Sequence, residues 1–486
     1  MDDPDSTAAL RAALRRATAT IKELREQSPS TPVGGPIAVI GAGLRFADGI
    51  EDLDAYWTAL RAGRSLITDM PRHRRWPFED EWDYLPTRGS FVTDPLSFDP
   101  GFFGFAPKAA QAMDPQHRLM LEVAWEALAH AGMDPNGELP ESVGTYVGIA
   151  GRQDYAAWEP EHVDPHWALA IGGGFAAGRI AYHFGFSGGA AGFDTACSSS
   201  LVAVHHAVAA LRRGESDLAL AGGVSLMLSP RSTAVIQQTG AMAPDGLCKA
   251  FDARANGYVR GEGGALLVLK RLADAVRDND RVLGVIHGSA VNQDARSSGF
   301  TAPNAEAQRR VIEAALADAG CKPEEIGLLE AHGTGTSLGD PIEASAIVAA
   351  LGTRNGGKPL HVGAVKANLG HLEAAAGVAG LIKALLCVRE RTVPPLAHFQ
   401  TLNPRIDLEG SDIRFSGHEV PWSLEEAGPL AGVSSFGAIG TNAHVIVGPA
   451  PEGTPALPPG GDIQRPGWNR IPCAPAFLGT APRVPR

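Results

Sequence analysis

The chain has 486 residues, of which 44% are apolar and 20% are charged, and its formal net charge at pH 7 is −12. This length is too great for one small module and suits one large α/β domain or two fused ones with a sizeable core. The composition excludes disordered, collagen-like and coiled-coil proteins. The negative charge argues against bulk attraction to nucleic acid or to an anionic membrane.

The N-terminus and the use of cysteine favour a reduced, cytoplasmic setting. The N-terminal MDDPDS is acidic and is followed by no apolar core, so it does not resemble a secretory signal. The longest apolar run, residues 374–388, is interrupted by Lys383 and is too short to span a bilayer. The five cysteines lie far apart and form no CxxC pair, which argues against a disulfide framework or a structural zinc site. They are Cys197, Cys248, Cys321, Cys387 and Cys473.

A short helix is predicted within residues 1–29. Its apolar residues recur at alternating intervals of four and three, as in a heptad seam, and Pro29 ends the run. A helix this short is marginal alone in water, so we expect it to dimerise or to dock onto another chain. A terminal helix with chance spacing is the alternative. The seam consists of Leu10, Leu14, Ala17, Ile21 and Leu24.

A linker at residues 30–36 precedes the predicted body of the chain, residues 37–448. The body opens with the apolar run IAVIGAG. In it, candidate strands alternate with helical patterns such as residues 117–132, which predicts mainly parallel sheets covered by helices. Residues 449–486 are rich in proline and are expected to form an extended tail. The other strand candidates are residues 145–150, 218–228, 281–291, 326–332, 360–367 and 443–447.

Two short motifs match functional fingerprints but lack the required context. GAGLRF at residues 41–46 follows a strand, but Phe46 replaces the third glycine of a dinucleotide-binding loop. GFSGG at residues 185–189 has the pattern of a nucleophile elbow, but no helix opens after it. Neither NAD binding nor a Ser187 nucleophile is therefore favoured.

Residues 192–214, GFDTACSSSLVAVHHAVAALRRG, carry the strongest sign of chemistry. A short strand leads into Cys197, and a helix that is apolar nearly all round opens directly after it. A cysteine at a helix N-terminus lies beside unpaired N–H groups and the positive end of the helix dipole, which favour the thiolate. The N–H of Cys197 would then face an acyl oxyanion. A buried structural cysteine is the alternative, and the other four cysteines lack this setting.

Two histidines lie in glycine-rich turns that follow candidate strands. His332 lies in EAHGTGTSLGDPIEA (330–344), and His371 lies in KANLGHLEAAAGVAG (366–380). Glycines around each histidine allow a substrate chain to approach closely, although either residue alone could be structural. A thiol that holds an acyl group and two imidazoles that donate to an enolate together suit acyl-thioester chemistry. The glycine-rich loop SSFGAIGTNAH (434–444) would add a second oxyanion N–H.

These motifs, in this order, resemble those of the β-ketoacyl synthases, in particular the ketosynthase domain of modular type I polyketide synthases. The quoted segments are joined by AMDPQHRLMLEVAWEAL and VNQDARSSGFTAPN, and the resemblance spans about residues 36–448. It implies the α/β thiolase-like fold, a five-layered αβαβα arrangement of two similar halves, usually as a homodimer. Here the half with the nucleophile would be residues 37–280, and the half with the histidines would be residues 281–448.

The resemblance also implies roles for single residues. Cys197 would accept the acyl chain from an acyl carrier protein. His332 and His371 would support decarboxylation of a carrier-bound malonyl-type extender, with Lys366 in the same polar network. Thr334 and Thr336 would contact the phosphopantetheine arm, and the oxyanion hole would use the backbone N–H groups of Cys197 and Ala438. The resemblance implies no metal and no bound cofactor, because the carrier's phosphopantetheine brings the substrates.

Some features depart from the family pattern. Gly192 and Phe193 stand where Thr-Val or a similar pair is expected, residues 171–179 lack the usual polar side chains, and residues 295–299 read ARSSG rather than GASNG. These positions are expected to shape the acyl pocket. No acyltransferase, reductase or carrier segment follows the body. Together with the MDDPDS start, this favours a free-standing ketosynthase whose N-terminal helix docks onto an upstream synthase module.

Four functions compete. The first is chain extension by decarboxylative condensation. The second keeps the acyl-cysteine but cyclises or releases a finished chain by intramolecular aldol or lactone formation, without an extender. A non-catalytic partner that sets chain length is a third, and the intact Cys197 argues against it. A thiolase acting on coenzyme A is the fourth, but the nucleophile motif and the docking helix fit carrier proteins better.

Overall fold

The computed structural model describes residues 34–150, 152–158, 165–296, 299, 301–352, 358–423, 427–455 and 465–474. The predicted N-terminal helix within residues 1–29 lies outside the described residues, as does most of the linker at 30–36. The chain from Pro36 onward forms a single unit, and it contains all the predicted site residues.

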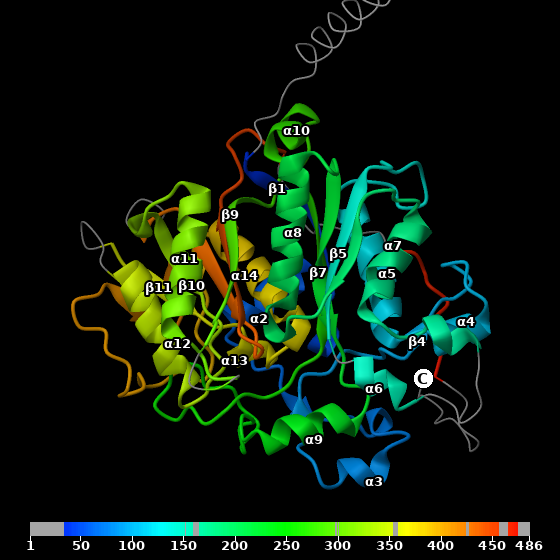
Figure 1. The fold of residues 1–486 in the computed structure, drawn as a ribbon, viewed down its shortest axis with the longest axis horizontal. Helices are drawn as coiled ribbons and strands as arrows, with labels where there is room; N and C mark the ends of the chain where they lie inside the picture. The colour runs from blue at the N-terminus through cyan, green and yellow to red at the C-terminus, as the bar shows by residue number, and fades with distance from the viewer. Residues whose placement is uncertain are drawn as a thin grey trace, which may run out of the picture. The chain divides into compact units, whose positions relative to one another are not determined.

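Among the described residues, eleven strands form one hydrogen-bonded ladder that divides into two halves (Figure 1). Strand β1 pairs with β8 along nearly its whole length but with β9 only at Ile37–Val39. The two groups of strands therefore diverge beyond this short junction. In order across the ladder the strands are β13 (Ile413–Phe415), β11 (Leu360–Gly363), β10 (Ile326–Glu330), β15 (Leu430–Phe436), β16 (Thr441–Gly448), β9 (Gly284–Gln293), β1 (Ile37–Phe46), β8 (Gly263–Arg271), β7 (Leu218–Ser225), β5 (Val143–Ile149) and β6 (Ala190–Phe193).

The ladder is mixed, so the prediction of mainly parallel sheets was only half right. The outer strands of each half pair in parallel, as β10 does with β11 and β5 does with β6 and β7. The strands nearer the junction pair antiparallel: β1 with β8, β7 with β8, β16 with β9 and β15 with β16. β15 and β16 are joined by only four residues, and a connection this short can join only antiparallel neighbours.

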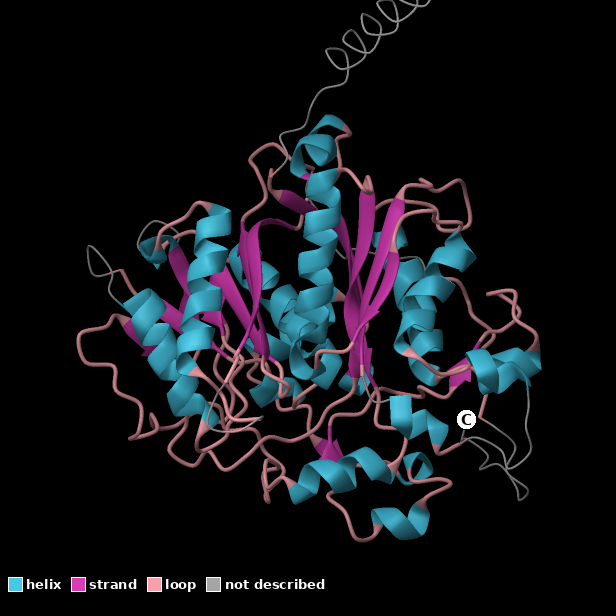
Figure 2. Cartoon of the chain, in the orientation of Figure 1, coloured by secondary structure: helices cyan, strands magenta, loops and turns pink. Residues whose placement is uncertain are grey.

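Helices fill three layers around the two groups of strands, which completes an αβαβα stack (Figures 1 and 2). The middle layer holds α2 (Leu53–Arg61), α8 (Ser199–Arg213) and α14 (Ala376–Glu390). Because strands lie on both sides of this layer, α8 and α14 are apolar nearly all round. One outer layer contains α11 (Ala305–Ala319) and α12 (Gly339–Ile347), and the other contains α5 (Pro115–His130) and α7 (Gly173–Phe184).

Shorter elements complete the described fold. The remaining helices are α3 (Glu79–Trp82), α4 (Pro107–Ala112), α6 (Arg152–Ala156), α9 (Pro230–Gln238), α10 (Leu272–Arg277) and α13 (Lys366–Leu369). The short strands are β2 (Thr68–Asp69), β3 (Arg88–Gly89), β4 (Ser97–Phe98), β12 (Thr392–Val393), β14 (Val420–Pro421) and β17 (Ile471–Pro472).

The departure from the family pattern at Gly192 has a packing reason. A Cβ atom on Gly192, in β6, would lie 2.3 Å from the carbonyl oxygen of Gly173, at the start of α7. The absence of a side chain therefore lets the first turn of α7 lie directly on the edge strand. The glycines at residues 172–174 and at 192 thus form one coupled feature of the fold.

Residues 465–474, one described part of the C-terminal tail, pack against the body, and we call them the docked tail. Ile471–Pro472 pairs antiparallel with Ser97–Phe98. The Trp468 ring packs edge-on against Trp125 of α5, with ring centroids 6.1 Å apart. Arg465 and Arg470 reach two buried glutamates of α5, Glu126 at 2.8 Å and Glu122 at 2.7 Å. This described part of the tail runs as an extended segment along the body.

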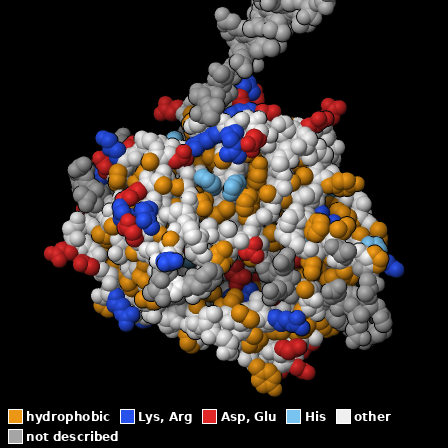
Figure 3. Space-filling model, viewed as in Figure 1, with side chains coloured by type: hydrophobic (Ala, Val, Ile, Leu, Met, Phe, Trp, Pro, Cys, Tyr) orange, Lys and Arg blue, Asp and Glu red, His pale blue; other side chains and the backbone are white. Residues whose placement is uncertain are grey.

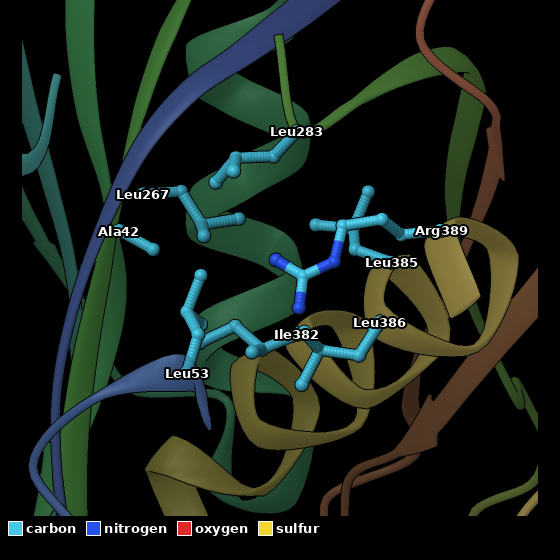
Figure 4. A pocket seen from close by; sticks show the side chains of 8 residues that line it. All are labelled: Ala42, Leu53, Leu267, Leu283, Ile382, Leu385, Leu386 and Arg389. Atoms are coloured by element: carbon cyan, nitrogen blue, oxygen red, sulfur yellow. The ribbon is translucent and has the colours of Figure 1, made fainter. Parts of the chain in front are cut away.

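A small cavity lies in the leucine-rich packing between α2, α14 and the strands (Figure 4). Its volume is about 10 Å³, enough for roughly one water molecule, and its apolar lining offers such a water few partners. It shares no residue with the predicted site, so we interpret it as a packing gap. The lining residues are Ala42, Leu53, Leu267, Leu283, Ile382, Leu385, Leu386 and Arg389.

Candidate active site

Cys197 lies in a sharp turn between the end of β6 and the start of α8. The turn, Ala196–Ser198, is a single 3-10 helical turn, and Ala196 before the thiol has a left-handed φ of 56°. Two side-chain hydrogen bonds hold it: the Thr195 N–H donates to Ser199 Oγ at 2.9 Å, and Ser199 Oγ donates to the Ala196 carbonyl at 2.6 Å. The serines after the cysteine therefore stabilise the turn that presents the thiol.

The surroundings of Cys197 act in opposite directions on the pKa of its thiol. Burial raises its pKa to about 11, and the nearby Glu373 carboxylate adds to the rise. Lys366 and the backbone N–H groups of Cys197 and Ala438 lower the pKa but do not outweigh burial. The setting at the helix N-terminus is as predicted, whereas the burial of the thiol was not visible from the local sequence.

The two predicted oxyanion donors both act on the sulfur. The N–H groups of Ala438 and of Cys197 itself lower the pKa of the Cys197 thiol. Ala438 belongs to the tight loop between β15 and β16, which is closed by a 2.8 Å bond from the Gly437 N–H to the Thr441 carbonyl. A Cβ atom on Gly437 would lie 2.2 Å from the Thr195 carbonyl oxygen, so only glycine allows this loop to approach the nucleophile turn.

His332 lies directly after β10 and is held at both its backbone and its ring. The Glu343 carboxylate accepts hydrogen bonds from the N–H groups of His332 at 2.7 Å and of Gly333 at 2.8 Å. The Phe436 N–H donates to Nδ1 of His332 at 3.3 Å. Because Nδ1 accepts this bond, a neutral ring carries its proton on Nε2.

His371 is held in the same tautomer and is almost fully buried, with 1% of its surface exposed. The Glu373 N–H donates to Nδ1 of His371 at 2.9 Å. Nε2 of His371 is buried and has no hydrogen-bond partner among the described residues. The rings of His332 and His371 stand nearly perpendicular, with centroids 5.6 Å apart. Burial, reinforced by Lys366, lowers the pKa of both histidines well below the usual value, so both rings are neutral near pH 7.

Lys366 and Glu343 complete the charged surroundings of the histidines. Lys366 opens α13 and is 3% exposed; burial lowers its pKa, while Cys197 and the Glu343 and Glu330 carboxylates oppose that fall. Burial raises the pKa of Glu343 to about 7. The sequence motifs did not single out Glu343, although it lies eleven residues after His332 in the same motif.

Thr334 and Thr336 lie together in the loop between β10 and α12. Their hydroxyl oxygens are 3.3 Å apart, and Thr336 Oγ1 also accepts the Gly339 N–H at 3.1 Å. The Asp340 carboxylate accepts the Gly335 N–H at 3.0 Å, which braces the loop from within. Thr336 therefore helps to cap the start of α12, whereas no such bond to the backbone is seen for Thr334 Oγ1 among the described residues.

The structure brings Ala438, Lys366, His332 and His371 together near the Cys197 thiol, and Thr334 and Thr336 lie in the loop that follows His332. Cys197 and the loop of Ala438 come from separate segments, and His332 and His371 come from two more. No group of His, Cys, Asp and Glu among the described residues is arranged to hold a metal ion. No helix within the described ranges is long and apolar enough to cross a membrane.

Comparison with known proteins gives family matches over most of the body. Residues 35–275 match the model of the β-ketoacyl synthase N-terminal domain, and residues 283–400 match that of the C-terminal domain. The chain is 47% identical over 427 residues to erythronolide synthase EryA2 of Saccharopolyspora erythraea, which covers 86% of this chain and 12% of the relative. It is also 47% identical over 440 residues to a phenolphthiocerol/phthiocerol polyketide synthase of Mycobacterium tuberculosis, covering 88% of this chain and 28% of that protein.

Solved ketosynthases have the same fold. The ketosynthase from module 6 of the bacillaene synthase of Bacillus subtilis 168 superimposes with a TM-score of 0.79 at 39% identity, covering 86% of this chain and 72% of that one. The Streptomyces albus JA3453 oxazolomycin ketosynthase domain OzmH KS7 gives 0.78 at 35% identity, covering 87% and 75%. The predicted thiolase-like fold and the family resemblance are therefore confirmed. The chain belongs to the β-ketoacyl synthase family of acyl-transferring enzymes, as a ketosynthase of the polyketide synthase type.

Proposed function

We propose that this ketosynthase extends a carrier-bound polyketide by decarboxylative Claisen condensation, with the growing acyl chain held on Cys197. The observation that carries the proposal is the buried Nε2 of His371, which has no partner among the described residues and lies beside a second neutral imidazole. Two such donors near one thiol suit an enolate that develops next to an acyl-cysteine.

We expect acylation of Cys197 to proceed without a histidine acting as general base. Cys197 attacks the carbonyl of an incoming thioester, the negative charge on the oxygen is stabilised by the N–H groups of Cys197 and Ala438, and the pantetheine thiolate leaves. The proton lost by the Cys197 thiol balances the proton gained by the departing thiolate. Because Nδ1 of each histidine already accepts a hydrogen bond, neither neutral ring has a free lone pair for that proton.

Condensation then uses the two histidines as donors. The extender loses its carboxylate as carbon dioxide, and the electron pair of the broken carbon–carbon bond forms an enolate. The Nε2–H groups of His332 and His371 stabilise the enolate oxygen. The enolate carbon attacks the acyl carbonyl on Cys197, and the tetrahedral intermediate collapses to a β-ketoacyl carrier and the Cys197 thiolate, which regains a proton. Donors that are already oriented cost no reorganisation during this step.

The expected partners follow from the same site and from one face of the molecule. Phosphopantetheine of an acyl carrier protein would reach Cys197 past Thr334 and Thr336, and the N-terminal helix would dock onto the upstream synthase. At the end of the described ladder, β6 offers an unpaired strand edge, and apolar side chains are exposed beside α8 and over α7 (Figure 3). Tyr182 and Phe175 of α7 are 87% and 40% exposed. We propose that a second copy of the chain covers this face as a homodimer.

Cyclisation or release without an extender is the second candidate. The glycine-rich start of α7 favours it, because Gly173 packs against Gly192 of β6, the strand that leads to the Cys197 turn. Small residues at this contact would leave room for an acyl chain on Cys197 to fold back on itself. Cys197 would still hold the chain, and the loss of carbon dioxide would play no part.

The deciding experiment supplies acylated enzyme with malonyl- or methylmalonyl-carrier and follows carbon dioxide and product mass together. Extension predicts carbon dioxide in equal amount to a lengthened chain on the carrier, and neither in the Cys197→Ala variant. A product that leaves without any extender, and still depends on Cys197, would replace extension by the cyclase function. Cys387→Ser is the matched control, because Cys387 is fully buried in the apolar core of α14.

A further inference from the structure

Glu373 connects the catalytic centre to a buried network. Its N–H donates to Nδ1 of His371, and it does so from a left-handed backbone conformation with φ 46°. A residue other than glycine adopts this conformation only at a cost in free energy, so other contacts must hold it there. The Glu373 carboxylate supplies them by accepting two bonds from Arg260, at 2.6 Å from Nε and 3.1 Å from Nη2.

Arg260 is itself fixed from two directions. Its backbone lies against that of His371: the His371 N–H donates to the Val259 carbonyl at 2.7 Å, and the Gly261 N–H donates to the His371 carbonyl at 2.9 Å. Its Nη1 donates to Ser232 Oγ at 2.8 Å and to Thr233 Oγ1 at 2.6 Å, both at the start of α9. Arg260 is 3% exposed, so its guanidinium is a rigid anchor.

Two other buried arginine–glutamate pairs among the described residues allow a comparison. Arg45–Glu126 and Arg74–Glu262 are also two-point pairs, and both of their carboxylates are fully buried. The Glu373 side chain instead keeps 19% of its surface exposed and acts electrostatically on Cys197 and on Tyr258. The Arg260–Glu373 pair thus places its anion near the catalytic thiol.

We propose that Arg260 and Glu373 are a positioning pair for the condensation. Arg260 holds Glu373 in its left-handed conformation, the Glu373 N–H then keeps Nδ1 of His371 as an acceptor, and Nε2–H remains aimed at the enolate. Arg260 also neutralises the Glu373 carboxylate, so that the carboxylate of an extender is not repelled from the site. The role of Arg260 in neutralising Glu373 rests on the proposed extension function, whereas its role in positioning His371 does not.

Substitutions at Arg260 and at Glu373 should have different effects on the site. Arg260→Lys keeps the positive charge but loses the fork that binds Glu373 at two points, so the turn at Glu373 loosens. Glu373→Gln keeps the backbone N–H and one acceptor for Arg260, and it removes the charge that disfavours the Cys197 thiolate. We therefore expect Arg260→Lys to impair the histidine and Glu373→Gln to make the thiol more reactive.

The test uses the full chain and two readouts. Carbon dioxide release from malonyl-carrier should fall about tenfold in kcat in Arg260→Lys and Arg260→Met, with KM within about twofold, and should change less in Glu373→Gln. The rate at which iodoacetamide alkylates Cys197 at pH 7, followed by mass spectrometry, should be at least about threefold higher in Glu373→Gln than in the wild type. Arg61→Met, which breaks an exposed pair with Glu419, is the matched control and should leave both readouts unchanged.

A third readout separates this proposal from the function itself. Histidine labelled with ¹⁵N reports the tautomer of His371 by NMR without any substrate, and thermal unfolding shows whether each variant folds. Wild-type protein should show Nε2–H, and Arg260→Lys should show a mixture of tautomers. If the wild type releases no carbon dioxide, extension fails while the tautomer result still decides the positioning pair. An unchanged tautomer in Arg260→Lys, or unchanged alkylation in Glu373→Gln, overturns the pair.

Discussion

The docked tail and the catalytic centre both bury polar groups, but the tail pairs its charged side chains within the protein. The tail brings Arg465 to Glu126 and Arg470 to Glu122, so each glutamate of α5 that it covers has a cation. The catalytic centre leaves Nε2 of His371 buried without a partner among the described residues. An unpaired buried donor costs free energy and persists where a ligand will use it, whereas the tail uses its charges to hold the fold.

The largest expected effect at the catalytic centre follows the loss of its thiol. Cys197→Ala removes the atom that carries the acyl chain, and no other described cysteine lies between the two oxyanion N–H groups. We expect acylation by an acyl-carrier or a small soluble thioester to fall on the order of a thousandfold or more. Intact-protein and peptide mass spectrometry check this. An adduct that persists in the variant, or that maps to Cys248, would show that Cys197 is not the residue that carries the acyl group.

A smaller but still large effect is expected at the loop that brings Ala438 to the sulfur. Gly437→Ala places a methyl group 2.2 Å from the Thr195 carbonyl oxygen, so either the loop or the nucleophile turn must move. We expect turnover to fall by about ten- to a hundredfold, because an oxyanion donor leaves its position. Steady-state kinetics measure it. Gly467→Ala in the docked tail is the control, since its Cβ meets no described atom within 4 Å. Equal losses in both variants would mean that the loop does not position a donor.

The candidate site residues could be found in the sequence because each motif carries its own turn. Cys197 and His332 follow strands, His371 follows α13, and the fold brings these segments together. The motifs did not predict the burial that raises the thiol pKa, because that depends on the segments that cover Cys197. They also missed pairs that join distant parts of the chain, such as Arg260 with Glu373, 113 positions apart, and Arg470 with Glu122, 348 positions apart.

The directions of the strands were likewise not predictable from local sequence patterns. Alternating strand and helix patterns predicted layers correctly, but the direction of each strand depends on the connections near the junction at β1. A proline-rich composition likewise predicted an extended tail. It did not show that Trp468 and two arginines match an aromatic and acidic surface on α5. Local patterns therefore predicted elements, whereas long-range charge pairing had to come from the structure.

Loss of the ion pair between Arg470 of the docked tail and Glu122 is expected to lower stability to an extent that depends on pH. Burial raises the pKa of Glu122 to about 7 in the folded protein, above the ordinary 4.5, while Arg470 lowers it. A raised carboxyl pKa favours the fold at low pH, and this contribution is lost as pH rises through the folded value. Arg470→Met raises the pKa of Glu122 further. At pH 5 Glu122 is protonated in both the wild type and the variant, so the substitution costs little stability there.

At pH 8 the same variant leaves a buried carboxylate without its cation. We expect it to lower the free energy of unfolding by about 1–3 kcal/mol at pH 8 and by less than about 1 kcal/mol at pH 5. Urea unfolding at both pH values measures this, with Arg61→Met as an exposed control that changes neither. Acylation of Cys197 in the folded variant should stay at the wild-type rate. An equal loss of stability at both pH values would show that the tail acts by packing rather than by charge.

The smallest effects are expected at the two threonines, which differ within one loop. Thr336 Oγ1 accepts the Gly339 N–H, whereas Thr334 Oγ1 is bonded only to Thr336 among the described residues. Thr336→Val should therefore lower the free energy of unfolding by about 1 kcal/mol, as for a lost helix cap, and also weaken substrate capture. Thr334→Val should raise KM for the acyl-carrier by a few-fold, about the loss of one hydrogen bond, with no change in stability. Kinetics with carrier-bound and with short soluble thioesters measure this. An equal rise in KM with a thioester that lacks the pantetheine amides would mean that Thr334 does not contact the arm.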